Sequence, residues 1–240
     1  MEQYHVETFL NDLETFGIFL SKEQTGQFLM YYEMLAEWNE RMNLTAIIAY
    51  EDVLKKHFVD SLSLAKVCDL KQNMSLIDVG TGAGFPGLAL KIAFPGLKVT
   101  LLDSLNKRIQ FLDAVTERLE LKDVRTVHGR AEDFAKPGKL RESFDLCVSR
   151  AVANLSTLSE YCLPFVRTGG LFVAYKSEKA ACEMEEAGKA IALLGGRLKE
   201  RVEFTLPDSD IYRSFFVIEK AERTPGKYPR KAGLPSKEPL

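Results

Sequence analysis

The chain has few of the residues that build disulfide frameworks and metal centres. Its 240 residues include only four cysteines and three histidines. The cysteines are Cys68, Cys147, Cys162 and Cys182. They show no Cys-x-x-Cys spacing and three of them lie in apolar runs, so we expect reduced thiols in a hydrophobic core. Because the histidines are scattered without partners at ligand spacing, we expect no metal.

Long apolar runs and a strong overall charge are also missing. No run reaches the roughly 18 residues that span a membrane, and the N-terminus lacks the basic start and apolar segment of a secretory signal. We therefore expect a cytoplasmic protein that does not contact membranes. The net charge is −2, but residues 1–60 carry 4 Lys and Arg against 11 Asp and Glu, whereas 221–240 carry 5 against 2. Any nucleic acid would have to meet local basic patches.

The most informative stretch is a strand that leads into a glycine-rich turn and then a helix. Residues 75–79 form a short apolar run of strand type. The glycines that follow are Gly80, Gly82, Gly84 and Gly87. They allow backbone angles and close approaches that a Cβ would block, and Pro86 fits the first turn of the next helix. Such a turn is typical of a cofactor-binding loop.

Two cofactor classes compete for this loop. Residues 82–87 fit the Gly-x-Gly-x-x-Gly pattern of dinucleotide-binding proteins, so a nicotinamide enzyme is one alternative. Asp78, however, places a carboxylate where a pyrophosphate needs neutral or positive surroundings. The ammonium and sulfonium of S-adenosylmethionine suit a carboxylate better, so the loop favours a methyltransferase. A structural turn without a ligand is the third interpretation.

A second acid supports the cofactor interpretation. Residues 98–103 form another apolar strand, which ends in Asp103, 19 residues after Gly84. In doubly wound folds, an acid about 20 residues beyond the glycine loop accepts hydrogen bonds from ribose hydroxyls. An Asp at a strand end also serves as a helix N-cap. Its spacing from the loop favours the ribose contact.

The pattern along the chain divides it into three regions. Residues 1–70 have a helical pattern, with a capping box at Ser21-Lys-Glu-Gln24 and aromatic side chains between Phe28 and Trp38 at the spacing of a helix core. Residues 71–222 alternate strands with helices and form the predicted methyltransferase domain. Residues 223–240 are basic and rich in Pro and Gly, so we expect an extended, mobile tail.

The alternation predicts an α/β fold of Rossmann-like type, with a mostly parallel, seven-stranded sheet covered on both faces. A C-terminal antiparallel hairpin closes it. The expected strands are 75–79, 98–103, 124–128, 144–149, 170–175, 197–206 and 211–220. The expected helices are 86–94, 107–120, 154–166 and 178–194.

Six motifs occur in an order that is specific to one family. They are Trp38-Asn-Glu-Arg-Met-Asn-Leu-Thr45, His57-Phe-Val-Asp-Ser61, Asp78-Val-Gly-Thr-Gly-Ala-Gly-Phe-Pro-Gly87, Gly129-Arg-Ala-Glu-Asp133, Ser149-Arg-Ala-Val-Ala153 and Tyr228-Pro-Arg-Lys-Ala-Gly233. In these motifs the chain resembles, nearly end to end, the bacterial small-subunit ribosomal RNA guanine-N7 methyltransferases, formerly called glucose-inhibited division protein B.

The resemblance implies an enzyme that binds S-adenosylmethionine and methylates N7 of guanine 527 in the 530 loop of 16S ribosomal RNA, either free or in the small subunit. It also implies cofactor contacts by Gly80 and Phe85, an adenine bracketed by Ala131 and Glu132, and Arg150 at a mouth shared by cofactor and substrate. The whole expected cofactor set is Asp78, Gly80, Thr81, Gly82, Gly84, Phe85, Asp103, Ala131, Glu132 and Arg150. We expect a monomer.

The acceptor implied by the resemblance needs no general base. Guanine N7 has an in-plane lone pair and no proton, so its methylation rests on positioning. Consistent with this, the chain lacks the Asn/Asp-Pro-Pro-Tyr motif of amino-methylating enzymes and the Pro-Cys nucleophile of cytosine-C5 enzymes. Arg150 and Lys176 are the candidates for contact with guanine O6 or phosphate, with surface salt bridges as the alternative. His57 and Asn43 are candidates to assist from the N-terminal region, but for both a helix cap or core hydrogen bond is the simpler expectation.

Other functions fit parts of the pattern. A methyltransferase acting on a small molecule or a protein shares the loop, and the acidic N-terminal region favours it slightly. A non-enzymatic binding protein would bind the cofactor without turnover. If the basic tail clamps RNA phosphates, deletion of residues 224–240 should weaken RNA binding and leave cofactor binding intact; a plain disordered tail is the alternative.

Overall fold

A seven-stranded sheet forms the centre of the computed structural model, which describes residues 4–150, 153–177 and 183–240. The strands are β1 (Ser75–Val79), β2 (Lys98–Asp103), β3 (Val124–His128), β4 (Phe144–Arg150), β5 (Val166–Lys176), β6 (Gly196–Thr205) and β7 (Tyr212–Lys220). Their order is β3-β2-β1-β4-β5-β7-β6. Strands β1 to β5 are parallel, and β7 pairs antiparallel with β5 and β6. The Rossmann-like sheet and its C-terminal hairpin are therefore confirmed.

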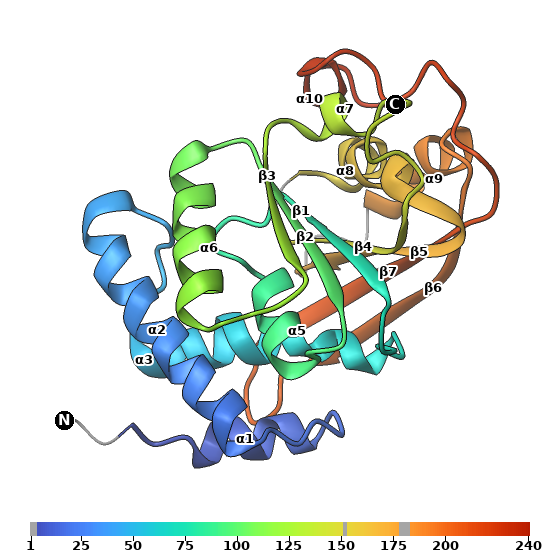
Figure 1. Ribbon diagram of the computed structural model, residues 1–240. Helices are drawn as coiled ribbons and strands as arrows, with labels where there is room; N and C mark the ends of the chain where they lie inside the picture. The colour runs from blue at the N-terminus through green and yellow to red at the C-terminus, as the bar shows by residue number, and fades with distance from the viewer. Residues whose placement is uncertain (1–3, 151–152, 178–182) are drawn as a thin grey trace.

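Helices cover both faces of this sheet (Figure 1). They are α1 (Glu7–Glu14), α2 (Lys22–Met42), α3 (Tyr50–Val53), a π-helical turn (Leu54–Val59), α4 (Asp60–Leu62), a 3-10 turn (Ser63–Lys66), α5 (Gly87–Ala93), α6 (Asn106–Arg118), α7 (Ala131–Phe134), α8 (Leu155–Cys162), a 3-10 turn (Leu163–Phe165), α9 (Glu183–Leu193) and α10 (Leu234–Lys237). Helices α5 and α6 pack on one face together with the N-terminal helices, and α8 and α9 pack on the other.

Most boundaries lie within two residues of those expected, and the differences have local causes. The helix expected to reach residue 166 ends at Cys162, because a 3-10 turn follows around Pro164, which has no N–H to donate. Strand β5 begins at Val166, four residues early. Pro86 occupies the N-cap of α5 rather than its first turn. Residues 178–182, including Cys182 and the expected start of α9, lie outside the described residues.

The N-terminal helices share one continuous hydrophobic core with the sheet. This core extends from Phe9 in α1 through Phe111 in α6 to Val217 in β7. The capping box at Ser21 is present, and Phe28 and Tyr31 are fully buried, as a core stripe requires. Between α2 and α3, residues 43–49 leave the helical conformation expected for 1–70. The N-terminal region therefore lies directly beneath the glycine-rich turn.

Tyr31 makes that contact. Its hydroxyl donates a hydrogen bond to the Ala83 carbonyl at 2.5 Å, and its ring stacks on Phe85 with centroids 5.3 Å apart. Gly84 lies against the hydroxyl, where a Cβ would collide with it and come within 2.8 Å of Leu88. A side chain of α2 thus supports the turn between β1 and α5 from below.

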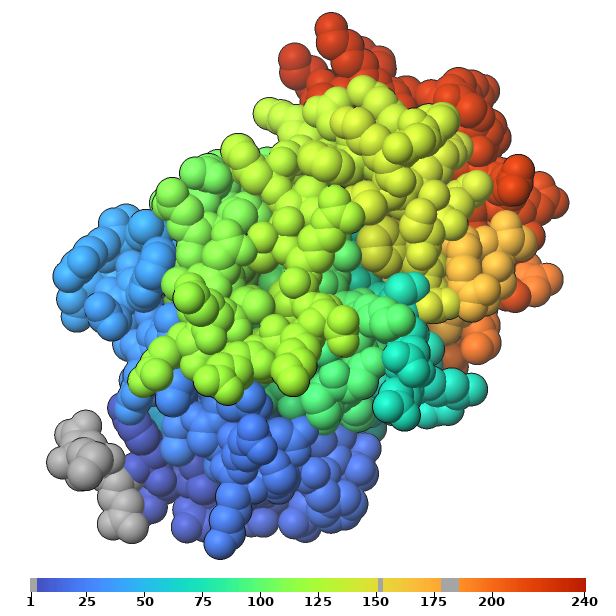
Figure 2. Space-filling model, viewed as in Figure 1, coloured from blue at the N-terminus to red at the C-terminus, as the bar shows by residue number. Residues whose placement is uncertain are grey.

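The C-terminal segment, residues 224–240, is not the free extended tail that its composition predicted. It folds back over α7 and α8 (Figures 1 and 2) and contains the short helix α10. Arg230 forms a bidentate ion pair with the fully buried Glu160 of α8, with nitrogen–oxygen distances of 2.7 and 3.0 Å. The Arg141 guanidinium donates to the carbonyls of Thr224 and Tyr228. Composition does not predict this arrangement, because the partner of the Arg230 charge is a buried carboxylate on a helix that is distant in sequence.

Other expectations concern what the fold contains. Cys68, Cys147 and Cys162 are buried free thiols, as expected. Across the part of the chain that the structure describes, no helix is both long and apolar enough to cross a membrane. Nor do the described residues include three or more His, Cys, Asp or Glu side chains grouped to hold a metal ion.

A matched pair of glycine substitutions tests the support of the turn. Gly82 and Gly84 both have positive φ, +63° and +97°, but only Gly84 lacks room for a Cβ. We expect Gly84→Ala to lower the free energy of unfolding by about 1–3 kcal/mol more than Gly82→Ala, because overpacking adds to the shared backbone strain. Urea denaturation of both variants without ligand measures the difference. Equal losses would show that Tyr31 does not constrain the turn.

Candidate functional site

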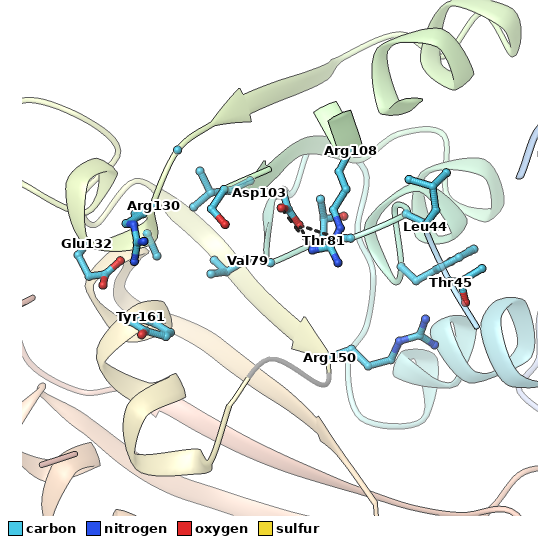
Figure 3. Close-up of a pocket in the computed structure, with 18 of the residues that line it drawn as sticks. Leu44, Thr45, Val79, Thr81, Asp103, Arg108, Arg130, Glu132, Arg150 and Tyr161 are labelled. Atoms are coloured by element: carbon cyan, nitrogen blue, oxygen red, sulfur yellow. Dashed lines mark hydrogen bonds and ion pairs between the residues drawn. The ribbon is translucent and has the colours of Figure 1, made fainter. Parts of the chain in front are cut away.

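A cavity of about 430 Å³ opens at the carboxyl ends of β1, β2 and β4. The chain leaves β1 toward β2 on one side and leaves β4 toward β5 on the other, which makes the edge between β1 and β4 the switch point where doubly wound sheets bind ligands. The lining residues include Leu44, Thr45, His57, Val79, Gly80, Thr81, Gly82, Ala83, Phe85, Leu102, Asp103, Ser104, Arg108, Gly129, Arg130, Ala131, Glu132, Arg150 and Tyr161. Figure 3 shows side chains converging on it from both sides.

Eight of the residues expected from the sequence line this cavity, and three do not. Those in the lining are Gly80, Thr81, Gly82, Phe85, Asp103, Ala131, Glu132 and Arg150. The three outside the lining are Asp78, Gly84 and Lys176. Gly84 packs downward on Tyr31, and the Lys176 ammonium donates to the Ala153 carbonyl at 2.7 Å.

Asp78 lies under the glycine-rich turn instead of facing a ligand. It is fully buried, and its Oδ2 accepts hydrogen bonds from the Thr81 hydroxyl at 2.7 Å and the Gly87 N–H at 2.8 Å. Burial raises the pKa of this carboxyl to about 6, against the lowering effect of both hydrogen bonds. The sequence correctly predicted that Asp78 lies beside the loop. Its side chain, however, points from β1 into the helix layer, where it holds the two ends of the turn together.

Asp103 occupies the end of β2 as its spacing predicted. Its Oδ2 accepts from the Gly82 N–H at 2.9 Å, and its Oδ1 accepts from the Leu105 N–H at 2.9 Å. The Arg108 guanidinium lies 3.1 Å from Oδ2. Asp103 is not the N-cap of α6, which is Leu105, but its carboxylate joins the glycine turn to that residue and borders the cavity. The ribose contact stays a prediction.

Arg150 is fixed in place at the opposite side of the cavity, as Figure 3 shows. Its guanidinium donates to Asp60 Oδ2 at 2.8 Å and to the Lys56 carbonyl at 3.3 Å. Asp60 is buried and also accepts from Arg213 Nε at 2.7 Å. The Arg150 guanidinium lies 5.3 Å from the centre of the Phe85 ring, within cation–π range. Arg150 is thus a preorganised cation rather than a mobile surface side chain.

His57 belongs to the wall of the same site, whereas the sequence favoured a cap or core role over a role at the site. Its ring stacks on Phe85 at 4.4 Å, and its Nδ1 lies 3.2 Å from Arg150 Nη2. Because a guanidinium can only donate, Nδ1 accepts, and the proton of the neutral ring is on Nε2, 3.0 Å from the Thr45 hydroxyl. Burial, assisted by the Arg150 charge, lowers the pKa of His57 to about 3.

The π-helical turn explains how His57 reaches the site. It spans Leu54–Val59, and such turns often occur where a helix must direct a side chain or a carbonyl toward a functional site. Here it directs both the His57 ring and the Lys56 carbonyl toward Arg150. In the sequence, the family motif that starts at His57 was the one signal that this residue belongs to the site. The π-helical turn itself has no sequence signature.

The far end of the cavity is formed by α7 and α8. Glu132 is buried, and its Oε1 accepts from the Gly233 N–H at 2.8 Å. Tyr161 lines the cavity from α8, and burial together with the Glu132 charge raises the pKa of its hydroxyl. Arg130 and Ala131 complete this end. Acceptors and a small apolar surface therefore lie together, which suits the polar edge and flat face of a purine.

Several lining residues escaped the sequence analysis. They include Leu44, Thr45, Arg108, Arg130 and Tyr161. Thr45 and Arg130 lie within two of the six family motifs, so the sequence contained a signal for both residues. Arg108 lies in the first turn of α6 and Tyr161 in the last turn of α8, where an arginine or tyrosine has the same sequence pattern as any solvated side chain.

Comparison with solved structures supports the fold. TrmN from Thermus thermophilus matches with a TM-score of 0.52 at 18% identity, over 70% of this chain and 53% of that one. TYW2 from M. jannaschii, solved in complex with AdoMet, matches with a TM-score of 0.51 at 15% identity, over 64% of this chain and 70% of that one. Identities this low show the shared fold alone.

Sequence comparison is far more specific. The ribosomal RNA small subunit methyltransferase G of Lachnoclostridium phytofermentans is 54% identical over 233 residues, which cover 97% of this chain and 96% of the relative. That of Staphylococcus carnosus is 52% identical over 236 residues, 98% of each chain. Residues 24–212 match the family described as rRNA small subunit methyltransferase G. With its Rossmann-like fold and motifs from Trp38 to Gly233, the chain belongs to this family.

Proposed function

We propose that the protein uses S-adenosylmethionine to methylate N7 of guanine 527 in the 530 loop of 16S ribosomal RNA. Family membership supports the methylation of ribosomal RNA. The structural observation that carries the proposal is the convergence of Asp103, Glu132 and Arg150 on one cavity at the switch point of the sheet. The guanine and its position in the 530 loop are taken from the family resemblance.

The cavity residues fit S-adenosylmethionine. Asp103 offers carboxylate lone pairs at the ribose position, and Glu132 with Ala131 offers an acceptor and an apolar wall for adenine. The turn at Gly80 and Gly82 leaves the backbone accessible to the amino-acid part. When bound, the cofactor supplies an electrophilic methyl group on its sulfonium. The tasks left to the protein are to hold both reactants in line and to exclude water.

Arg150 and His57 have complementary tasks in this proposal. Arg150 presents a fixed guanidinium that can donate to guanine O6 or to a phosphate while N7 stays free. His57 accepts from Arg150 and stays neutral, so it orients the guanidinium without adding charge. This matters because methylation at N7 makes the base cationic. Lys176 lies outside the cavity lining, so we assign it no contact with the base.

The proposal is tested by methyl transfer to small subunits that lack the modification. Labelled S-adenosylmethionine provides the methyl group, and borohydride with aniline then cleaves the RNA at N7-methylguanine. Cleavage at one guanine in the 530 loop is the expected result. Label without cleavage would overturn the N7 assignment. No label in RNA, but label in metabolites or protein, would favour the small-molecule or protein alternative, whereas cofactor binding without any transfer would favour a non-enzymatic role.

Replacement of Arg150 tests the positioning role. Arg150→Gln removes the fixed cation but leaves Asp60 paired with Arg213. We expect methyl transfer at saturating cofactor to fall by about 100-fold or more, since lost preorganised donors cost that much in other enzymes. The matched control is Arg125→Gln, at an exposed position of β3. Single-turnover rates for both variants decide the matter, and a loss below threefold for Arg150→Gln would contradict the role.

The low pKa of His57 predicts a specific dependence of stability on pH. Free histidine titrates near pH 6.5 and His57 near pH 3, so between these values the unfolded chain binds more protons and stability falls as pH decreases. From pH 7 to pH 5 this loss is about 2 kcal/mol. His57→Asn removes this pH-dependent loss. From pH 7 to pH 5, the free energy of unfolding of the variant should therefore fall by about 2 kcal/mol less than that of the parent. Urea titrations at both pH values, with exposed His5→Asn as control, measure the gain; parallel curves would contradict it.

A further inference from the structure

The C-terminal segment 224–240 meets the cavity at a single buried residue. The Gly233 N–H donates to Glu132 Oε1 at 2.8 Å, and Glu132 is only 3% exposed although it lines the cavity. Beside it, the Ser236 side chain of α10 lies close enough to the Tyr161 hydroxyl to lower its pKa, against the raising effect of burial. The segment therefore contacts, from behind, two residues that form one end of the cavity.

Helix α8 holds the segment in this position through a row of polar contacts. Arg230 makes its ion pair with Glu160, and its backbone N–H donates to Glu160 Oε1 at 2.7 Å. The Thr157 hydroxyl donates to the Pro235 carbonyl at 3.0 Å. Glu160 has no exposed surface, so its charge depends on Arg230. The ion pair thus fixes the chain three residues before Gly233.

From these contacts we infer that the C-terminal segment is part of the cofactor site, and that Arg230 is a positioning residue acting through Gly233 on Glu132. The inference rests on the proposed function, since it takes Glu132 as a cofactor contact. Glu132 needs a defined orientation to present its second oxygen to the cavity, and the Gly233 N–H is the donor that holds the first. Loss of the Arg230 ion pair frees Gly233 and leaves Glu132 with several orientations.

An RNA-clamping role for this segment fits the structure less well. Arg230 has both its Nε and Nη2 engaged by Glu160, so the cations that the segment leaves for phosphates are the exposed Lys227, Lys231 and Lys237. The earlier part of the segment is held by Arg141, which binds its carbonyls. The segment is thus built into the domain, and its removal should affect the cofactor before the RNA.

Calorimetric titration of S-adenosylmethionine into the full chain tests the inference, at a temperature well below unfolding. We expect Arg230→Gln to raise the Kd about tenfold, with a matching rise in the KM for the cofactor and little change in kcat. The matched control is Arg167→Gln, which breaks the Arg167–Asp145 ion pair at the amino ends of β4 and β5, away from the cavity. Its Kd should equal that of the parent.

A second variant separates affinity from stability. Arg230→Gln leaves Glu160 buried without its partner, so the double variant Arg230→Gln with Glu160→Gln keeps the position neutral and folded. We expect its Kd to remain about tenfold raised although its thermal stability recovers. A parental Kd in the double variant, or reduced RNA affinity with unchanged Kd in either variant, would overturn the inference. If the parent itself fails to bind S-adenosylmethionine, the proposed function fails first.

Discussion

A carboxylate cannot remain charged in a protein interior unless cations or N–H groups surround it, and this requirement organises the whole molecule. Asp60 recruits Arg150 from β4 and Arg213 from β7. Asp78 gathers both ends of the glycine-rich turn. Glu160 draws the C-terminal segment onto α8 through Arg230. Each buried acid joins segments that are distant in sequence. Asp78 and Glu160 lie in elements that border the cavity, and Asp60 directly follows the π-helical turn that carries His57.

Because these acids join distant segments, the regions that flank the sheet become parts of the site. The N-terminal region contributes Asp60, His57 and Tyr31, which fix Arg150 and the turn. The division into regions 1–70, 71–222 and 223–240 remains our proposal for the organisation of the chain. In the described structure, however, the first and last regions share the core or the polar contacts of the middle one. Removing either would therefore disturb the site itself.

The sequence predicted the sheet well because its signals are local. Alternating apolar runs and the glycine turn gave strands such as Ser75–Val79 and Lys98–Asp103 to the residue. It failed where the decisive partner is remote in sequence. Asp78 was expected to face a ligand, because no local pattern determines on which side of the sheet its side chain lies. The C-terminal segment was expected to be mobile, because no pattern near it predicts a contact with Glu160. For His57 a cap or core role was favoured for the same reason, since its place at the site depends on Arg150, 93 residues away.

The charges around the cavity also explain why the site has no need of a titrating base. Arg150 has its charge fixed by Asp60, and His57 is held neutral by burial and by that same guanidinium. Asp78, whose pKa is raised to about 6, is enclosed beneath the turn and lies outside the cavity lining. An acceptor nitrogen with a free lone pair and no proton is the chemistry that such a site can serve, because it asks only for alignment. The fold therefore uses its buried acids to hold the side chains around the cavity in place.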